Sequence, residues 1–444
     1  MSRLNPHLLR SAGVAALGSL LFGFDTAVIS GATEALRLQY GLSSQLLGLT
    51  VASALIGTIL GSLAVGPPLE RRGRGPVLRG LALLYLVSAL GCGAAWNWPA
   101  LLFFRFVGGL AIGGSSVAAP MYIAEIAPPA RRGRLVALSQ LNVVAGILVA
   151  YLSNSLVELA LGDASSGAWR VMLGLPAVPA ALFYLLAVGI PESPRWLIGQ
   201  RRRAEAEAVL ALVGTPGPAA VAAEIEGSLQ SDTVAASEPF FTRKYRRPIL
   251  LALMVATFNQ VSGINALIYY TADIFAMAGA ARASALWQSV TIGVTNLVFT
   301  LLAMTVIDRI GRKRLLLIGA LGLAACLFSA AYAFETHRGA LLLASLIGYI
   351  AFFAFSQGAV IWVYLAEIFP NRVRARGQAL GSFVHWFWAA AVSWSFPVVA
   401  EASGGLAFAF FGAMMLLQFV MVLVFLPETK GVSLEAIQRQ LGID

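Results

Sequence analysis

One carboxyl group and one guanidinium group lie inside segments that are otherwise apolar. Asp25 follows Phe22 and Phe24 and precedes Val28, and Arg105 is the only Lys or Arg that lies inside a membrane helix and not at the loop ends where the basic residues gather. An ionised carboxylate at membrane depth costs a few kcal/mol, so Asp25 should be protonatable or paired, and Arg105 is its obvious partner. In a protonation cycle, neutral Asp25 releases Arg105 and deprotonation restores the pair. The alternative is a static ion pair that only fixes helix packing.

Two short acidic and basic loops carry a second set of charged groups. They contain Glu70, Arg71 and Arg74 in the first copy, and Asp308, Arg309 and Arg312 in the second. Bidentate Arg–carboxylate pairs can hold neighbouring helix ends together in one state and release them in another. The alternative is that these residues only anchor the loops at the membrane surface.

These groups require a frame of membrane helices. The 444 residues are 59% hydrophobic and only 12% charged, and the mean hydropathy is +0.80, which indicates that lipid is the solvent for much of the chain. About 20 apolar residues cross a bilayer core as a helix. Such runs lie at 11–32, 46–67, 76–95, 100–124, 135–158, 169–190, 247–276, 286–307, 315–334, 340–365, 377–400 and 404–426. We therefore predict an all-α membrane protein with twelve transmembrane helices, because the alternating ten-residue segments of a membrane barrel are absent.

The net charge of +10 reflects orientation in the membrane and does not indicate a nucleic-acid partner. Arg37, Arg170, Arg282 and Arg338 are the only basic residues in the loops of one side. The loops after the even-numbered helices and both termini carry the others, apart from Arg105. This positive-inside pattern predicts a multi-pass protein of the inner or plasma membrane with both termini in the cytoplasm.

The chain contains an internal duplication. Three motifs return in the same order at an offset of about 240 positions. They are Glu70–Arg74 and Asp308–Arg312, Glu125–Pro128 and Glu367–Pro370, and Pro191–Ser193 and Pro427–Thr429. Six helices in each copy give both halves one orientation, and substrate sites of such parallel repeats lie near mid-membrane between the halves.

The longest polar stretch divides the helices six and six. We predict an N-terminal six-helix bundle at 1–190, a cytoplasmic linker with short helices at 191–246, a C-terminal six-helix bundle at 247–426 and a cytoplasmic tail at 427–444. An amphipathic helix of the linker is expected around 202–213.

The chain resembles the sugar porter family of the major facilitator superfamily from end to end. The motifs that carry this resemblance are GFDTAVISGA at 23–32, the two acidic-Arg-x-Gly-Arg loops, PMYIAEIAPPARRG at 120–133, PESPRWL at 191–197, NQVSGINALIYY at 259–270, AEIFPN at 366–371 and PETKG at 427–431. PESPRWL together with PETKG separates sugar porters from other facilitators. The resemblance implies the major facilitator fold, built as two six-helix parallel repeats, and secondary active transport of a monosaccharide, a hexose or a pentose, by alternating access.

The resemblance also implies a sugar site built from amides and aromatic rings. Its amides are Gln140, Asn259, Gln260, Asn265 and Asn296. Amides suit hydroxyl groups that both donate and accept, and an unpaired buried amide is costly, which makes such a site selective. The rings of Phe22, Phe353, Trp362 and Trp386 stand at positions that cover the faces of the sugar. The alternative role for the amides is hydrogen bonding between membrane helices.

Several positions depart from the family pattern and bear on the preferred sugar. Asn259 stands where the family usually has Gln, and His385 stands where Asn or Gln often precedes the tryptophan. Ile147 matches glucose transporters, including passive ones, better than the polar residue of xylose symporters. Ala359 stands where relatives often have Pro, which predicts a stiffer tenth helix.

The family pattern further assigns gating and proton coupling. Tyr269 and Tyr270 resemble a lid over the sugar on the extracellular side, and packed interface tyrosines are the alternative. Glu125, Arg132, Glu367 and Arg374 match residues that, with the charged loops, hold the cytoplasmic side closed. An acid at the position of Asp25 accompanies proton symport in sugar porters, whereas Asn there accompanies passive facilitation. Pro176, however, stands where some proton-coupled relatives have a second carboxylate.

Other classes of function fit the residues less well. His7, His337 and His385 are scattered, and no G-x-G-x-x-G or P-loop follows a strand, so we expect no enzyme, metal or cofactor. A passive sugar facilitator, a polyol or inositol transporter and a sugar sensor that does not transport remain alternatives. The expected partners are the monosaccharide, protons and the lipid bilayer, and one twelve-helix chain contains a complete pathway, so we expect a functional monomer.

Overall fold

The computed structural model of the chain describes residues 5–128, 132–162, 167–235, 239–370, 372–432 and 434–443. Within these residues twelve spans are long and apolar enough to cross a membrane, which confirms the predicted all-α membrane fold. The chain divides into two compact units. Unit 1 consists of Met1–Thr26, Ser53–Ala150 and Arg170–Ser237, and unit 2 consists of Ala27–Ala52, Tyr151–Trp169 and Glu238–Asp444.

Unit 1 contains most of the first six spans. Its helices are α1 (Pro6–Val28) up to Thr26, α3 (Ser44–Ala64) from Ser53, α4 (Gly66–Arg72), α5 (Arg74–Gly93), α6 (Trp98–Ile126), α7 (Arg132–Leu161) up to Ala150, α8 (Ala168–Gly174) from Arg170 and α9 (Ala177–Ala187). The Asn97 side chain accepts a hydrogen bond from the Ala100 amide, 2.9 Å away, and thereby caps α6. Leucine and alanine side chains of α1, α5, α6 and α9 form the core of the unit.

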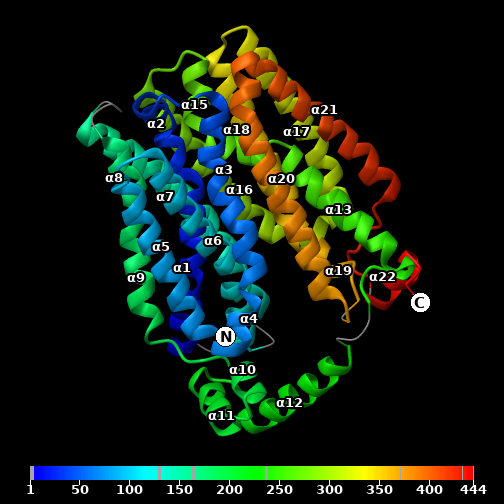
Figure 1. Cartoon of the computed structure of the whole chain (residues 1–444). Helices are drawn as coiled ribbons and strands as arrows, with labels where there is room; N and C mark the ends of the chain where they lie inside the picture. Colours follow the sequence, from blue (N-terminus) through cyan, green and yellow to red (C-terminus); the bar gives the residue numbers. More distant parts are fainter. Residues whose placement is uncertain are drawn as a thin grey trace. The chain divides into compact units, whose positions relative to one another are not determined.

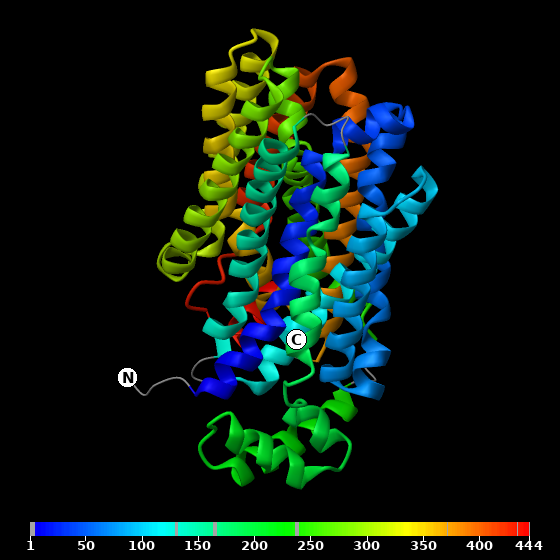
Figure 2. The same cartoon turned by 90° about the vertical axis from the view of Figure 1, so that its left-hand side faces the viewer.

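Three short helices of unit 1 follow the sixth span. They are α10 (Pro194–Gly199), α11 (Arg203–Leu212) and α12 (Pro218–Ala235), and α11 lies where the sequence predicted an amphipathic helix. Leu197, Leu210 and Ala222 belong to a small apolar core that these helices share. Figure 2 shows this group in green beyond the ends of the blue and cyan spans. The Trp196 indole donates to the Glu70 carbonyl oxygen at 2.8 Å, which ties the group to the end of unit 1 that carries Arg74.

Unit 2 contains the last six spans together with ends of the first, second, fifth and sixth. Its elements are η1 (Ile29–Gly31), α2 (Thr33–Tyr40), the adjoining parts of α1, α3, α7 and α8, η4 (Arg243–Tyr245), α13 (Arg246–Val261), α14 (Ile264–Tyr269), α15 (Thr271–Met277), α16 (Arg282–Ile310), α17 (Arg312–Glu335), α18 (Gly339–Phe355), α19 (Gln357–Glu367), α20 (Arg374–Ala402), α21 (Gly404–Phe425) and α22 (Leu434–Leu441). Helices α17 and α21 pack side by side (Figure 1).

Several predicted helices are interrupted. The continuous helix expected at 247–276 is three helices. Gly263 adopts a left-handed conformation (φ +88°) that separates α13 from α14, and a second break at Tyr270 separates α14 from α15. The helix expected at 340–365 is broken at Ser356, between α18 and α19, so the expectation that Ala359 stiffens it is wrong. The helix expected at 169–190 is divided between α8 and α9.

Candidate functional site

A chain of amide side chains lies at the broken span of unit 2. Asn265 Nδ2 donates to Gln260 Oε1 at 2.7 Å, and Gln260 Nε2 donates to Asn259 Oδ1 at 2.9 Å. Asn259 Nδ2 in turn lies 3.4 Å from the Gln357 carbonyl oxygen at the break between α18 and α19. Asn259 and Gln260 are 3% and 1% exposed and Asn265 is half-buried, so the hydrogen bond between Gln260 and Asn259 forms away from bulk water.

The break at Gly263 is what brings Asn265 to Gln260. Residues five apart on an uninterrupted helix are about 140° apart around its axis and do not face each other. Here α14 begins anew at Ile264, and the Tyr349 hydroxyl donates to the Ser262 carbonyl oxygen at 3.0 Å, which satisfies a carbonyl that the break leaves free. The motif therefore positions its amides by interrupting the helix.

An imidazole and two indoles border the amide chain. Gln260 Nε2 lies 3.1 Å from both ring nitrogens of His385. The rings of Trp362 and His385 have centroids 5.1 Å apart, and those of His385 and Trp386 are 4.9 Å apart, edge to face. Trp362 is 38% exposed whereas Trp386 is 4% exposed, so Trp362 is the ring available to a ligand. An accessible aromatic face beside hydrogen-bonded amides suits a ligand whose ring has apolar faces and carries hydroxyl groups.

Two other predicted site residues of unit 2 lie apart from these hydrogen bonds. Asn296 is 8% exposed and its Oδ1 lies 3.5 Å from Thr300 Oγ1, one turn further along α16. Phe353 stacks on Tyr349 with centroids 6.3 Å apart. The hydrogen bonds described for unit 2 therefore join three of the predicted amides and do not reach Asn296.

The predicted lid tyrosines are packed into unit 2. Tyr269 and Tyr270 are 2% and 1% exposed. The Tyr270 hydroxyl donates to the Ser393 carbonyl oxygen of α20 at 3.0 Å, and its ring stacks on Phe396 at 5.3 Å. Their position places them between α13 and α15, directly after the amide motif.

In unit 1, Asp25 and Arg105 lie side by side. Arg105 Nη1 is 3.2 Å from both carboxylate oxygens of Asp25. The Arg105 side chain is 1% exposed and that of Asp25 is 17% exposed, so the carboxylate is the member of the pair that water can reach.

Close packing of α1 on α7 positions the remaining predicted residues of unit 1. A Cβ atom on Gly23 would lie 1.8 Å from the Val143 carbonyl oxygen, so no other residue permits this approach. Phe22 and Gln140 are partly buried and Ile147 is 5% exposed. The glycine of the GFD motif thus fixes how the helix of Asp25 lies against the helix of Gln140.

The charged motif of unit 1 forms a compact network, and the end of the unit that carries it is called here its basic end. Arg74 binds Glu125 with two hydrogen bonds, from Nε at 2.8 Å and from Nη2 at 2.6 Å. Glu192 accepts hydrogen bonds from the backbone amides of Arg74 and Gly75 at 2.8 and 3.1 Å, and so caps α5. The Tyr122 hydroxyl donates to the Pro191 carbonyl oxygen at 2.7 Å.

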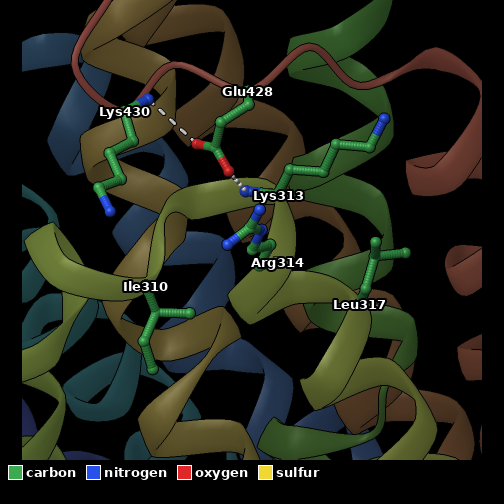
Figure 3. A pocket seen from close by; sticks show the side chains of 6 residues that line it. All are labelled: Ile310, Lys313, Arg314, Leu317, Glu428 and Lys430. Atoms are coloured by element: carbon green, nitrogen blue, oxygen red, sulfur yellow. Dashed lines mark hydrogen bonds between the residues drawn. The ribbon is translucent and has the colours of Figure 1, made fainter.

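The same network recurs at the basic end of unit 2. Arg312 Nη2 binds Glu367 Oε1 at 2.9 Å, and Glu428 accepts from the amides of Arg312 and Lys313 at 2.9 and 3.1 Å. Figure 3 shows Glu428 turned toward the Lys313 amide in a pocket that Lys430 and Arg314 also line. The charged lining separates this pocket chemically from the amide chain.

The other predicted gating residues are placed less tightly. Glu70, Arg71 and Arg309 are exposed, and no ion pair involves them within the described part of the chain. Arg374 Nε lies 3.3 Å from the Phe369 carbonyl oxygen. The side chains of Arg132 and Asp308 lie outside what the structure describes.

Two groups of residues near these sites were not anticipated from the sequence. Gln357 Nε2 donates to Gln418 Oε1 at 2.8 Å, which extends the amide chain toward α21. The sequence signal for Gln357 and Gln418 is the one that marked the predicted amides, namely an amide residue within an apolar span. At the other end of unit 2, Arg282 contacts Glu34 and Glu158. Arg282 is one of the few basic residues of its side, which is a signal that singles it out.

Comparison with known proteins gives matches over nearly the whole chain. The family described as "Sugar (and other) transporter" matches residues 12–441. The D-xylose-proton symporter of Escherichia coli strain K12 is 37% identical, with 96% of this chain and 94% of that protein covered. A glucose transporter of Staphylococcus epidermidis is 35% identical, with 99% and 98% covered. The structure of the proton:xylose symporter XylE of the major facilitator superfamily, bound to 6-bromo-6-deoxy-D-glucose, matches with a TM-score of 0.82 at 35% identity, with 99% and 100% covered.

Proposed function

The chain belongs to the sugar transporter family and is a multi-pass membrane transporter rather than an enzyme, and from this premise we propose that it carries a monosaccharide together with protons by alternating access. The observation that carries the proposal is the chain of amides from Asn265 through Gln260 to Asn259, bordered by His385 and the accessible ring of Trp362. Amides that bind each other can exchange those bonds for bonds to sugar hydroxyls at little net cost.

We propose a hexose as the preferred sugar. Relatives of this chain carry xylose, arabinose or glucose by name, so the family relation leaves hexose and pentose open. Ile147, buried on α7, favours the hexose, because it presents an apolar surface where the xylose symporters of the resemblance have a polar residue. Asn259 and His385 depart from the family pattern, so we expect these two residues to bind the sugar hydroxyls differently from the corresponding residues of relatives.

Coupling to protons is proposed to occur at Asp25. The deprotonated carboxylate pairs with Arg105, and a proton delivered through water to its partly exposed oxygens removes the charge and releases the arginine. The coupled movement is proposed to alternate with opening of the basic ends, where Arg74 and Arg312 bind Glu125 and Glu367. Tyr269 and Tyr270 are proposed to close over the sugar at the other end.

The orientation and the division of the chain follow from the sequence pattern. Both termini and the linker are proposed to face the cytoplasm, since the basic loops flank them. The functional halves are proposed to be 1–190 and 247–426, joined by the linker at 191–246, with a tail at 427–444. A single chain is proposed to transport as a monomer.

Uptake into proteoliposomes tests the proposal. Purified protein is reconstituted and offered labelled glucose, galactose or xylose, with and without an imposed proton gradient. A potential of 100 mV is worth about 2.3 kcal/mol per charge, enough for roughly 50-fold accumulation. Accumulation of glucose that depends on the gradient is the expected result, whereas equilibration without accumulation identifies a passive facilitator.

Two variants assign the parts of the mechanism. Asp25→Asn is expected to abolish accumulation while it preserves sugar exchange, because the neutral amide cannot lose a proton. Gln260→Ala is expected to weaken sugar binding by about 10- to 100-fold, since it removes hydrogen bonds from a buried site. Gln288→Ala is the matched control, because its amide binds Ser284 on the exposed face of α16. Undiminished accumulation in Asp25→Asn contradicts the coupling, and unchanged affinity in Gln260→Ala contradicts the site.

A further inference from the structure

Arg282 connects three segments at the end of unit 2 that lies away from its basic end. It begins α16, a helix of 29 residues, which puts it about 40 Å from Ile310. Arg282 Nη1 lies 2.5 Å from Glu34 Oε2 on α2, and Nε lies 3.1 Å from Glu158 Oε1 on α7. Its Nη2 also donates to the Gly31 carbonyl oxygen at 2.7 Å. One arginine of the second half of the chain thus holds two segments that come from the first half.

Asp273 on α15 contributes a third carboxyl group to this cluster. Its Oδ1 accepts a hydrogen bond from the Thr33 hydroxyl at 2.9 Å. Its Oδ2 is buried and has no hydrogen-bond partner among the described residues. A buried carboxylate oxygen that accepts no hydrogen bond is costly because its negative charge is not compensated. Protonation removes that charge, so the neutral carboxyl group is buried at a much smaller cost. The geometry around Asp273 therefore favours its protonated form.

The balance of charges in the cluster also favours the protonated form of Asp273. Glu34, Glu158 and Asp273 face Arg282 and Arg37, and Arg37 Nη2 also binds the Ser44 hydroxyl at 2.5 Å. Three carboxylates against two arginines leave one negative charge in excess. Glu34 and Glu158 are each paired directly with Arg282, whereas Asp273 makes no ion pair within the described residues, so Asp273 is the acid with the least compensation.

Few other titratable groups lie on the elements packed against α15. Helix α18 contains no carboxyl or basic side chain, and its only titratable group is the phenol of Tyr349, like the phenols of Tyr269 and Tyr270 in the preceding segment. His337 lines a pocket with Phe275 and Ala278 at the far end of α15. Next to the Asp273 carboxyl itself stand Thr33, Glu34, Arg37 and Arg282.

We propose that Asp273 is a second proton-binding carboxyl of this transporter, separate from Asp25, and that its protonation accompanies closure of this end of unit 2 around Arg282. The inference rests on the proposed transport cycle, because closure has a meaning only if this end also opens. Opening would separate α2 and the end of α7 from α15 and α16, and it would expose Asp273 to water.

The direction of the pH effect follows from the burial of the carboxyl group. Burial raises the pKa of Asp273 to about 7, and Glu34 also raises it, whereas the Thr33 hydroxyl and the two arginines lower it. In water the carboxyl has an ordinary pKa near 4, so the closed form binds the proton more tightly than the open form. Closure therefore gains stability as the pH falls below about 7 and loses that stability above it. A fall from pH 8 to pH 6 should raise the ratio of closed to open molecules about tenfold.

Distance measurements between spin labels test the proposal on the full chain in lipid nanodiscs. The labels are placed at Leu38→Cys on α2 and Ser284→Cys on α16, two exposed positions of unit 2, in a background without Cys92 and Cys326. Distance distributions are recorded from pH 5 to pH 9 without sugar and without a gradient. The expected result is a growing long-distance population above pH 7 that is absent in Asp273→Asn, whose neutral amide mimics the protonated form.

Three further variants complete the test. Thr33→Val removes the hydroxyl donor and is expected to shift the midpoint to higher pH. Asp25→Asn and Glu158→Gln are expected to retain a pH-dependent distance. A response that survives in Asp273→Asn, or that disappears in Asp25→Asn, overturns the proposal. Absence of proton-driven uptake of any sugar would contradict the proposed function but leaves these distances unaffected, so the two failures are distinguishable.

Discussion

The charged networks at the basic ends of units 1 and 2 share one skeleton and differ in how tightly it is bound. Each has an arginine on a glutamate, a second glutamate on two backbone amides, and a tyrosine on the carbonyl before that glutamate. Arg74 makes two bonds to Glu125, whereas Arg312 makes one to Glu367, whose other oxygen accepts from the Thr429 hydroxyl at 2.6 Å. The tyrosine bond is 2.7 Å in unit 1 and 3.5 Å in unit 2.

The difference shows which contacts recur in both copies of the duplicated motif and which have diverged. Glu192 and Glu428 bind the first two backbone amides of α5 and α17, which every sequence supplies, so these bonds recur in both copies, and Glu428 also accepts from the Lys430 amide. The partners of Glu125 and Glu367 are side chains, and there the copies diverge. Serine at 193 caps α10 through the Trp196 amide, while threonine at the matching position 429 donates to the oxygen of Glu367 that Arg312 does not bind. The bidentate pair should be the stronger of the two.

The largest expected effect comes from removal of the arginines. Arg74→Ala should lower the free energy of unfolding by about 3 kcal/mol, because it leaves Glu125 buried without its partner, and Arg312→Ala should cost about half as much. Denaturant unfolding of both variants in the same detergent measures the two losses. Equal losses would contradict the ranking of the two networks.

The capping glutamates should behave alike. Glu192→Gln and Glu428→Gln each replace one carboxylate oxygen by an amide group that faces backbone N–H donors, so each should cost about 2 kcal/mol. The same unfolding experiment gives both values. A clear inequality would show that the backbone contacts, and not only the side-chain contacts, have diverged.

Conservative replacement of the arginines isolates the geometry of the pair. Lysine keeps the charge but cannot make two parallel hydrogen bonds, so Arg74→Lys should cost about 1.5 kcal/mol and Arg312→Lys about 0.5 kcal/mol. A smaller loss for Arg74→Lys than for Arg312→Lys would mean that the second bond of Arg74 adds nothing.

The smallest effects separate the roles of the two hydroxyl groups. Thr429→Val and Ser193→Ala should each cost about 1 kcal/mol. Thr429→Val should couple with Arg312→Lys in a double-mutant cycle, because both act on Glu367, whereas Ser193→Ala should be additive with Arg74→Lys. Additivity in both cycles would show that Thr429 and Arg312 bind Glu367 independently.

The spans of the fold were predictable because hydrophobic length is a property of the chain itself. The confirmed twelve spans depend on nothing beyond apolar runs of sufficient length. The interruptions were not predictable in this way, because glycine and serine fit into an apolar run without changing its hydropathy. The break at Gly263 depends on its left-handed backbone and on the Tyr349 hydroxyl that binds Ser262, a residue 87 positions away.

Residue types in the sequence indicated most residues of the candidate site, but they indicated few of the contacts between those residues. Asp25 and Arg105 were paired because each is a lone charge in an apolar span, and their side chains lie 3.2 Å apart. The motifs named Arg74 and Glu125 without showing that Glu192 caps α5 instead of forming an ion pair. The contact of Arg282 with Glu34, and the place of Asp273 beside them, were not predicted, because these residues belong to no shared motif and only the packing of unit 2 brings them together.

Unit 2 combines early and late segments of the sequence, and this imposes an order on folding during synthesis. All of unit 1 has been synthesised once Ser237 is added, so this unit can complete its contacts while the rest of the chain is made. Unit 2 cannot, because it combines Ala27–Ala52 and Tyr151–Trp169 with helices made much later. Until then the Tyr151 and Thr33 hydroxyls lack Ile268 and Asp273, and the ends of three inserted helices remain without partners. Nascent chains halted near Ser237 should therefore be the species that chaperones and membrane proteases recognise.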